Sequence, residues 1–198
     1  MSGKLIVVSG PSGVGKSTVI ASLMKQWPNL RFSVSATTRP QRPSEVDGVN
    51  YYFVDKEKFR EMIAEEALLE YAEYVGNYYG TPEAPINAAM QDGVDVLLDL
   101  EVQGALNVKK RRPDAVLIFI AAPSFDVLEQ RLKGRGDTSD ELIKGRLKQA
   151  RWEYTQAPNY NYLVVNDQVE HAVDEIISIV TAEKCRMETR IHVLKEEL

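Results

Sequence analysis

The chain has 198 residues, of which 44% are hydrophobic, and a formal net charge of −5 at pH 7. This composition is ordinary for a soluble globular protein, and the acidic balance argues against extensive nucleic-acid binding. The apolar run at the start is too short for a signal sequence or a membrane span, and the single cysteine excludes an intramolecular disulfide. We therefore expect a cytoplasmic protein with no membrane or nucleic-acid partner and a buried Cys185.

Short apolar segments alternate with helical patterns along the chain. Helices are predicted over Lys16–Gln26, over Pro85–Gln91 and, with one apolar face, from Val169 to Val193. Strands buried on both faces of a parallel sheet are predicted for five segments: 4–9, 31–35, 94–99, 115–121 and 162–166. The alternation indicates an α/β fold in which helices flank a five-stranded parallel sheet.

Two segments interrupt this alternation. Residues 35–81 contain arginines, an Asp47-Gly48 turn, the strand candidate NYYFV, an amphipathic stretch and the aromatic loop GNYYGTP, so a small α+β insert is predicted there. A charged helical hairpin is predicted over residues 125–149, in which Gly134 and Gly136 would end one helix and Thr138 with Glu141 would cap the next. Such a hairpin is typical of a lid. The core then comprises 1–34, 82–124 and 150–198.

The strongest motif is GPSGVGKS, Gly10 to Ser17, which lies between a predicted strand and a predicted helix. In a P-loop of this kind the glycines let backbone N–H groups surround a phosphate, and the helix N-terminus adds positive potential. Lys16 would neutralise the β/γ oxygens, while Ser17 and Asp99, at the end of another predicted strand, would hold Mg²⁺. The motif alone leaves a GTPase, a transport ATPase, a nucleic-acid motor and a small-molecule kinase open.

The segment SATTRPQRP suggests a second anion site. Two prolines stiffen it, and Arg39 and Arg42 could bind a phosphomonoester through paired hydrogen bonds. Tyrosines in NYY and NYYG would supply hydroxyls and flat faces for a phosphorylated nucleoside.

The chain resembles guanylate kinases, the kinases that make GDP from GMP and ATP. SGPSGVGKST, SATTRPQRPSEVDGVNYYFV, EYVGNYYGTP, DLEVQGA, RLKGRG and VVND occur in the order and approximate spacing of that family. The resemblance implies a P-loop kinase core, a GMP-binding insert and a helical lid, with Mg²⁺ arriving on ATP and dGMP as a further acceptor. It implies GMP-binding residues at Ser35, Arg39, Arg42, Tyr51, Glu70, Tyr79, Thr81 and Glu101.

The same resemblance assigns the other nucleotide. The expected catalytic cations are Lys16, Arg39, Arg131, Arg135 and Arg146. The expected ATP-binding residues are Gly10, Pro11, Ser12, Gly13, Val14, Gly15, Lys16, Ser17, Thr18, Arg135, Asn166 and Asp167. His171 and His192 are expected to lie outside the site.

Guanine itself gives an independent check. Its N1–H and N2–H₂ donors need carboxylates, and its O6 acceptor needs a hydroxyl. Glu70, Glu101, Ser35 and Thr81 supply these groups, although many family members carry Asp where this chain has Glu101. Two alternatives stay open: a catalytically inactive interaction module, and a kinase for another phosphorylated acceptor.

Overall fold

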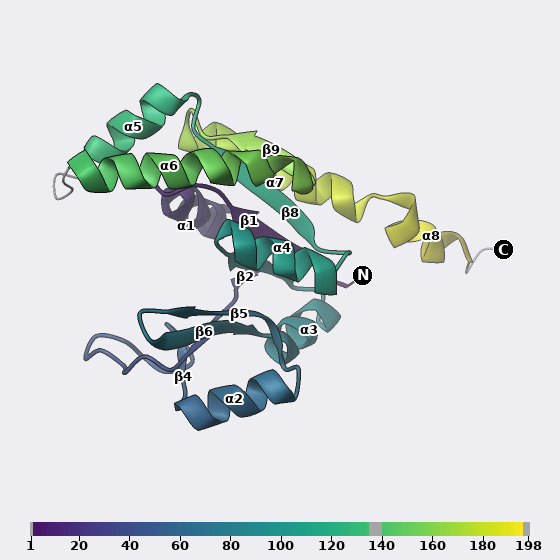
Figure 1. Ribbon diagram of the computed structural model, residues 1–198. Helices are drawn as coiled ribbons and strands as arrows, with labels where there is room; N and C mark the ends of the chain where they lie inside the picture. The colour runs from purple at the N-terminus through teal and green to yellow at the C-terminus, as the bar shows by residue number, and fades with distance from the viewer. Residues whose placement is uncertain (1, 135–139, 196–198) are drawn as a thin grey trace. The chain divides into compact units, whose positions relative to one another are not determined.

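The computed structural model describes residues 2–134 and 140–195, and Figure 1 shows their helices and strands. The strands are β1 (Leu5–Ser9), β2 (Leu30–Phe32), β3 (Ala36–Thr37), β4 (Tyr52–Phe53), β5 (Leu68–Tyr74), β6 (Asn77–Pro82), β7 (Asp95–Asp99), β8 (Val116–Ala121) and β9 (Tyr162–Val165). The helices are α1 (Lys16–Gln26), α2 (Lys56–Ala64), α3 (Glu83–Gln91), α4 (Val102–Arg111), α5 (Phe125–Lys133), α6 (Asp140–Gln156), the 3₁₀ helix η1 (Ala157–Asn159), α7 (Val169–Lys184) and α8 (Met187–Lys195).

Five strands form the larger sheet, in the order β2-β7-β1-β8-β9. β1 pairs with β8, β2 with β7, and β8 with β9, in each case in parallel. Every residue of β1 and β8 is buried, as expected for strands covered on both faces. The positions of all five predicted strands are confirmed within a few residues, and with them the α/β fold. The expected burial on both faces is wrong for β2 and β9, which lie at the edges of the sheet and carry exposed residues.

The helix predictions are confirmed with one correction. α1 has the predicted bounds, and α3 begins two residues before Pro85. The single helix expected from Val169 to Val193 is wrong, because α7 ends at Lys184 and α8 begins at Met187. The apolar face of α7 packs against α1, β8 and β9. Met187 and Val193 on α8 are exposed instead, so no comparable packing favours a continuous helix across the break.

The backbone contacts divide the described chain into two compact units. The first consists of residues 1–5, 29–98 and 103–115, and the second of residues 6–28, 99–102 and 116–198. The predicted division into core, insert and lid follows other boundaries and stays a prediction.

Within the first unit, the predicted insert has its own sheet and its own small core. The strand order is β4-β3-β6-β5, and Phe59 of α2 is fully buried with Ala36 and Leu68. The aromatic loop predicted at GNYYGTP is wrong in part: residues 77–82 form strand β6, which pairs with β5. A two-residue turn with positive φ at Val75 and Gly76 allows this hairpin, and cross-strand hydrogen bonding then overrides the loop-like composition.

The predicted lid is described in part. α5 ends at Lys133 with Gly134 as its C-cap, as expected, while Arg135, Gly136 and Thr138 lie outside the described residues. α6 runs without a break to Gln156, past the expected lid boundary at 149, and it packs against α5 within the second unit (Figure 1).

Two further expectations concern the surface. Cys185 is exposed, so the expected burial is wrong; it follows the last turn of α7, where the chain leaves the apolar face of that helix. Among the residues that the structure describes, no helix combines the length and apolarity that crossing a membrane requires.

Candidate active site

The phosphate loop follows β1 and leads directly into α1, whose N-cap is Gly15. Gly10 has φ 145°, and a Cβ there would lie 2.1 Å from the carbonyl oxygen of Ile120, so glycine is required at this position. Gly15 has φ 93°, and a Cβ would lie 2.5 Å from Nδ2 of Asn166. The Lys16 ammonium donates to the carbonyl oxygen of Gly10 at 2.6 Å, so its charge is held across the loop.

Two side chains from distant segments support the loop at Val14. The Asn166 amide donates to the Val14 carbonyl oxygen at 2.7 Å, and Arg131 donates to the same oxygen at 3.2 Å. Arg131 also donates to the backbone carbonyl of Asn166 at 3.0 Å. Asn166 is buried, and these contacts give both residues a structural part in fixing the loop. Asp167 is exposed beside them, and a hydrogen bond from the Gln168 amide lowers its pKa.

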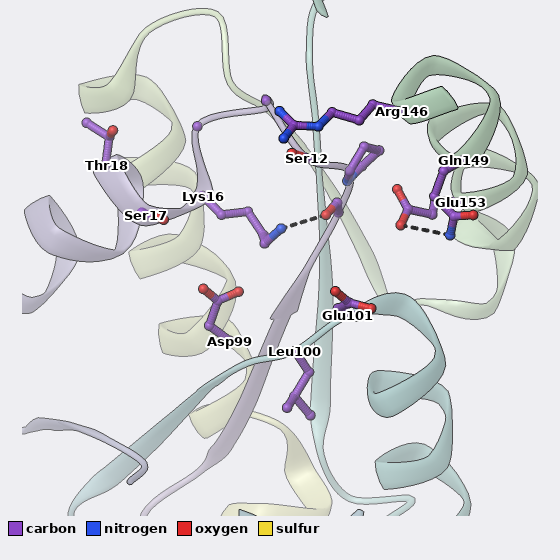
Figure 2. Close-up of a pocket in the computed structure, with 14 residues that line it drawn as sticks. Ser12, Lys16, Ser17, Thr18, Asp99, Leu100, Glu101, Arg146, Gln149 and Glu153 are labelled. Carbon is purple, nitrogen blue, oxygen red and sulfur yellow. Dashed lines mark hydrogen bonds between the residues drawn. The ribbon is translucent and has the colours of Figure 1, made fainter. Parts of the chain in front are cut away.

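A pocket of about 580 Å³ opens over the phosphate loop in the second unit, large enough for a nucleotide's phosphates (Figure 2). Its walls are formed by Gly10, Pro11, Ser12, Gly13, Gly15, Lys16, Ser17, Thr18, Asp99, Leu100, Glu101, Arg146, Gln149 and Glu153. The sequence analysis predicted most of these, but not Leu100, Gln149 or Glu153. Val14, Arg131, Asn166 and Asp167, also predicted, do not line it.

The charges in the pocket have mixed sign. The Asp99 carboxylate is exposed in the pocket wall, but the surrounding protein partly desolvates it, and this desolvation raises its pKa. The positive charge of Lys16 opposes the shift. On α6, Arg146 reaches toward the loop, and Gln149 and Glu153 follow on the same helix face (Figure 2). Their spacing of three and four residues is a helical signal that could have identified Gln149 and Glu153 from the sequence.

In the first unit, Arg39 is fixed by several contacts. Its guanidinium donates to Glu45 at 2.7 Å and to the Pro40 carbonyl at 2.8 Å, and it lies over the rings of Tyr51 and Phe53. Glu45 also accepts from the backbone N–H of Arg42, and the Arg39 contact lowers the pKa of Glu45. The sequence motifs single out Arg39 and Arg42 but give no separate signal for Glu45, which lies in the same quoted segment.

The other predicted GMP residues of this unit lie on or beside the small sheet. The rings of Tyr51 and Tyr79 meet edge to face with centroids 6.1 Å apart. The Thr81 hydroxyl, on β6, donates to Glu70 of β5 at 2.6 Å, and burial raises the pKa of Glu70. Ser35 is half-buried next to β3 and Arg42 is exposed. Glu101 lies instead in the second unit, where it is exposed and lines the pocket.

A phosphate loop that follows the central strand of a parallel sheet, with Lys16 held across it, places the chain among the P-loop nucleotide-binding proteins. Residues 2–183 match the model of the guanylate kinase family. The guanylate kinase of Desulfitobacterium hafniense (strain Y51) is 50% identical over 193 residues, which cover 98% of this chain and 96% of that protein. A guanylate kinase of Thermus thermophilus is 53% identical over 94% of this chain and 84% of its own.

The solved structures agree with these relatives. The crystal structure of guanylate kinase from Anaplasma phagocytophilum superposes with a TM-score of 0.70 at 35% identity, covering 93% of this chain and 88% of that one. The chain belongs to the guanylate kinase family and is an ATP:GMP phosphotransferase, which confirms the predicted function. The alternatives of an inactive module or a kinase for another acceptor are not favoured.

Proposed function

We propose that the pocket over the phosphate loop binds the phosphates of ATP, and that the residues predicted from the sequence divide the reaction between them. The observation that carries this proposal is the Lys16 ammonium, 2.6 Å from the Gly10 carbonyl, in the same pocket as Ser17, Asp99 and Arg146. The backbone N–H groups between Gly10 and Thr18, except at Pro11, which has none, bind the phosphate oxygens together with the positive end of α1. Asn166 and Asp167 approach the adenine, and Asn166 in addition supports the loop through Val14.

The pocket also fits Mg²⁺ carried by the nucleotide. Mg²⁺ prefers oxygen ligands, keeps several waters, and is often bound by one or two carboxylates together with substrate phosphates. The Ser17 hydroxyl and the Asp99 carboxylate, both in the pocket wall, would hold it, and it would neutralise charge on the β and γ phosphates. Across 2–134 and 140–195, no three His, Cys, Asp or Glu side chains form a metal cluster.

GMP is bound through its phosphate and its base by different residues. Arg39, Arg42, Tyr51 and Tyr79 take the phosphate, and the contacts of Arg39 with Glu45 and the aromatic rings fix its guanidinium in advance. Glu70 and Glu101 accept from N1–H and N2–H₂ of guanine, while Ser35 and Thr81 place hydroxyls for the base. Adenine has an acceptor at N1 where guanine has a donor, so it would place a lone pair against the carboxylates.

Phosphoryl transfer here needs position and positive charge more than proton transfer. The GMP phosphate oxygen is already an anionic nucleophile at neutral pH. Lys16, Arg39, Arg131, Arg135 and Arg146 supply the cations that stabilise the charge spread over the transferring group. Arg131 donates to two backbone carbonyls and retains further N–H groups of its fork, so its contribution includes holding the phosphate loop.

An ADP-release assay tests the acceptor assignment. GMP and dGMP should each support release, whereas AMP, CMP, UMP and dTMP should support little. Turnover of AMP as fast as that of GMP would contradict the division of the base site, and omission of Mg²⁺ should abolish release with every acceptor. We further propose that the protein acts in the cytoplasm, without membrane or nucleic-acid partners, because its substrates are small nucleotides.

A further inference from the structure

Glu153 is the residue of the pocket that the reaction as described does not use. It lies on α6 two helical turns after Arg146 and lines the same pocket, yet it is only 9% exposed, which is rare for a glutamate. Burial raises its pKa, the neighbouring charge of Glu101 adds to that effect, and the charge of Lys16 and a hydrogen bond from Gln149 oppose it. A buried carboxyl at this position requires a reason.

The two oxygens of Glu153 differ. Oε1 accepts from the Gln149 amide at 3.3 Å, whereas Oε2 is buried and accepts from no described residue. The hydroxyls of Ser9 and Tyr160 are likewise buried without a partner among the described side chains and backbone. A buried polar atom without a hydrogen-bond partner destabilises the fold.

The three residues are grouped around Phe119. Ser9 of β1 pairs with Phe119 of β8, the Tyr160 ring packs on Phe119, and so does the ring of Tyr154, the residue that follows Glu153. Burial raises the pKa of Tyr160 to about 12, and the Ser9 hydroxyl and the Glu153 carboxylate are the two groups that modify the shift. The Tyr160 ring packs edge to face on Phe119 with centroids 5.2 Å apart, which fixes the direction of its hydroxyl.

The donors and acceptors of the three groups match as a chain. A serine hydroxyl and a tyrosine hydroxyl each donate one hydrogen bond, and a carboxylate only accepts. Ser9 can therefore donate to Tyr160, and Tyr160 to Oε2 of Glu153, with no group left over. Ser9 immediately precedes Gly10, whose carbonyl accepts from Lys16, so this chain would join the start of the phosphate loop to the helix that carries Arg146.

We propose that Glu153 is a positioning residue for phosphoryl transfer: Ser9, Tyr160 and Glu153 close into a buried hydrogen-bonded relay that holds α6, and with it Arg146, against the phosphate loop. The proposal rests on the role proposed above for Arg146. The relay would give each of the three buried oxygens a hydrogen-bond partner, which favours its formation. A misplaced Arg146 would reduce the rate of transfer far more than it would reduce GMP binding.

The test compares variants that remove the hydrogen bonds with one that keeps them. Glu153→Leu and Tyr160→Phe should each lower kcat about tenfold with less than a twofold change in the KM for GMP. Glu153→Gln still offers an acceptor to Tyr160 and should stay within about threefold of the wild-type kcat. The double variant Glu153→Leu/Tyr160→Phe should lose no more than the worse single variant, because both break one relay.

The chain offers a matched control. The Tyr162 hydroxyl donates to the buried Glu183, away from the residues that line the pocket, so Tyr162→Phe and Glu183→Gln make similar changes at a second tyrosine–glutamate pair. They should alter Tm but leave kcat unchanged. If Glu153→Leu does not fold, the isosteric Tyr160→Phe and the small change Ser9→Ala carry the test.

The results separate the relay from the role of Arg146. Wild-type kcat in Tyr160→Phe, or additive losses in the double variant, would overturn the relay, as would a Glu153→Gln variant as slow as Glu153→Leu. Arg146→Ala is measured alongside. If Arg146→Ala loses its activity while the relay variants keep the wild-type kcat, only the relay is refuted. If Arg146→Ala keeps the wild-type activity, the proposed role of that arginine is refuted.

Discussion

Replacing Glu70 by glutamine should change stability and specificity in opposite directions. Glu70 is half-buried on β5, and the Thr81 hydroxyl donates to its Oε1 at 2.6 Å. Burial raises the pKa of this carboxyl above its ordinary value, so the folded state holds the proton more tightly than the unfolded state. The stability gained from protonation is present below the unfolded pKa and is lost as the pH rises through the raised folded pKa.

Glutamine removes this pH-dependent loss and keeps an acceptor for Thr81. Without nucleotide, Glu70→Gln should therefore have a Tm equal to or above that of the wild type at pH 7, with the difference vanishing at low pH. Thermal unfolding followed from about pH 4 to pH 8 measures this. Glu73→Gln on the same strand is the control, because Glu73 is exposed and its change should leave Tm nearly constant.

The effect on GMP should be a loss. A hydrogen bond to a charged group contributes about 1.5–3 kcal/mol, and an amide cannot accept from both N1–H and N2–H₂ as a carboxylate does. At about 1.4 kcal/mol for each factor of ten, kcat/KM for GMP should fall by about 10- to 150-fold. AMP turnover should change little, so the GMP-to-AMP ratio collapses. Equal losses for GMP and AMP would refute the assignment of Glu70 to the base, and a lower Tm at pH 7 would refute the argument from burial of its carboxyl.

Three other changes test the remaining parts of the site. Lys16→Ala should lower kcat by about 100-fold or more, because it removes the positive charge that stabilises the transferring phosphoryl group. A near wild-type kcat at saturating ATP would contradict this. Arg42→Ala should lower kcat/KM for GMP and for AMP by the same factor, since both acceptors carry the same phosphate. An altered ratio of the two values would count against a phosphate-binding role for Arg42. Gly15→Ala should destabilise the protein by about 1–3 kcal/mol, because φ is 93° and the added Cβ lies 2.5 Å from Asn166; an unchanged Tm in thermal unfolding would disprove the steric argument.

Several features of this protein can be predicted from the sequence alone, because they depend on local chemistry. The phosphate loop requires glycines and Lys16 at set spacing, and the buried strands need uninterrupted apolar residues, so both are legible without a structure. The same holds for α1, which begins where the loop ends and stops at Trp27-Pro28. The ordered set of motifs then identified the guanylate kinase family, because several independent local requirements had to be met together.

Tertiary structure decided what depends on contacts between distant segments. Strand β5 lies within an acidic run whose composition favours a surface helix or loop, and only pairing with β6 makes it a strand. Helix α7 stops at Lys184 because its packing surface ends there, which the continuing apolar pattern conceals. Arg131 donates to backbone carbonyls of Val14 and Asn166, contacts that no local pattern encodes.

Glu153 illustrates the same limit most clearly. In the sequence it is one more charged residue on a helix, for which solvent exposure is the ordinary expectation. Its burial follows from the path of α6, which brings Glu153 into the same pocket wall as the phosphate loop. Burial, and therefore the electrostatics and hydrogen bonding of a site, depends on which segments meet in space, and the sequence determines that only through the whole fold.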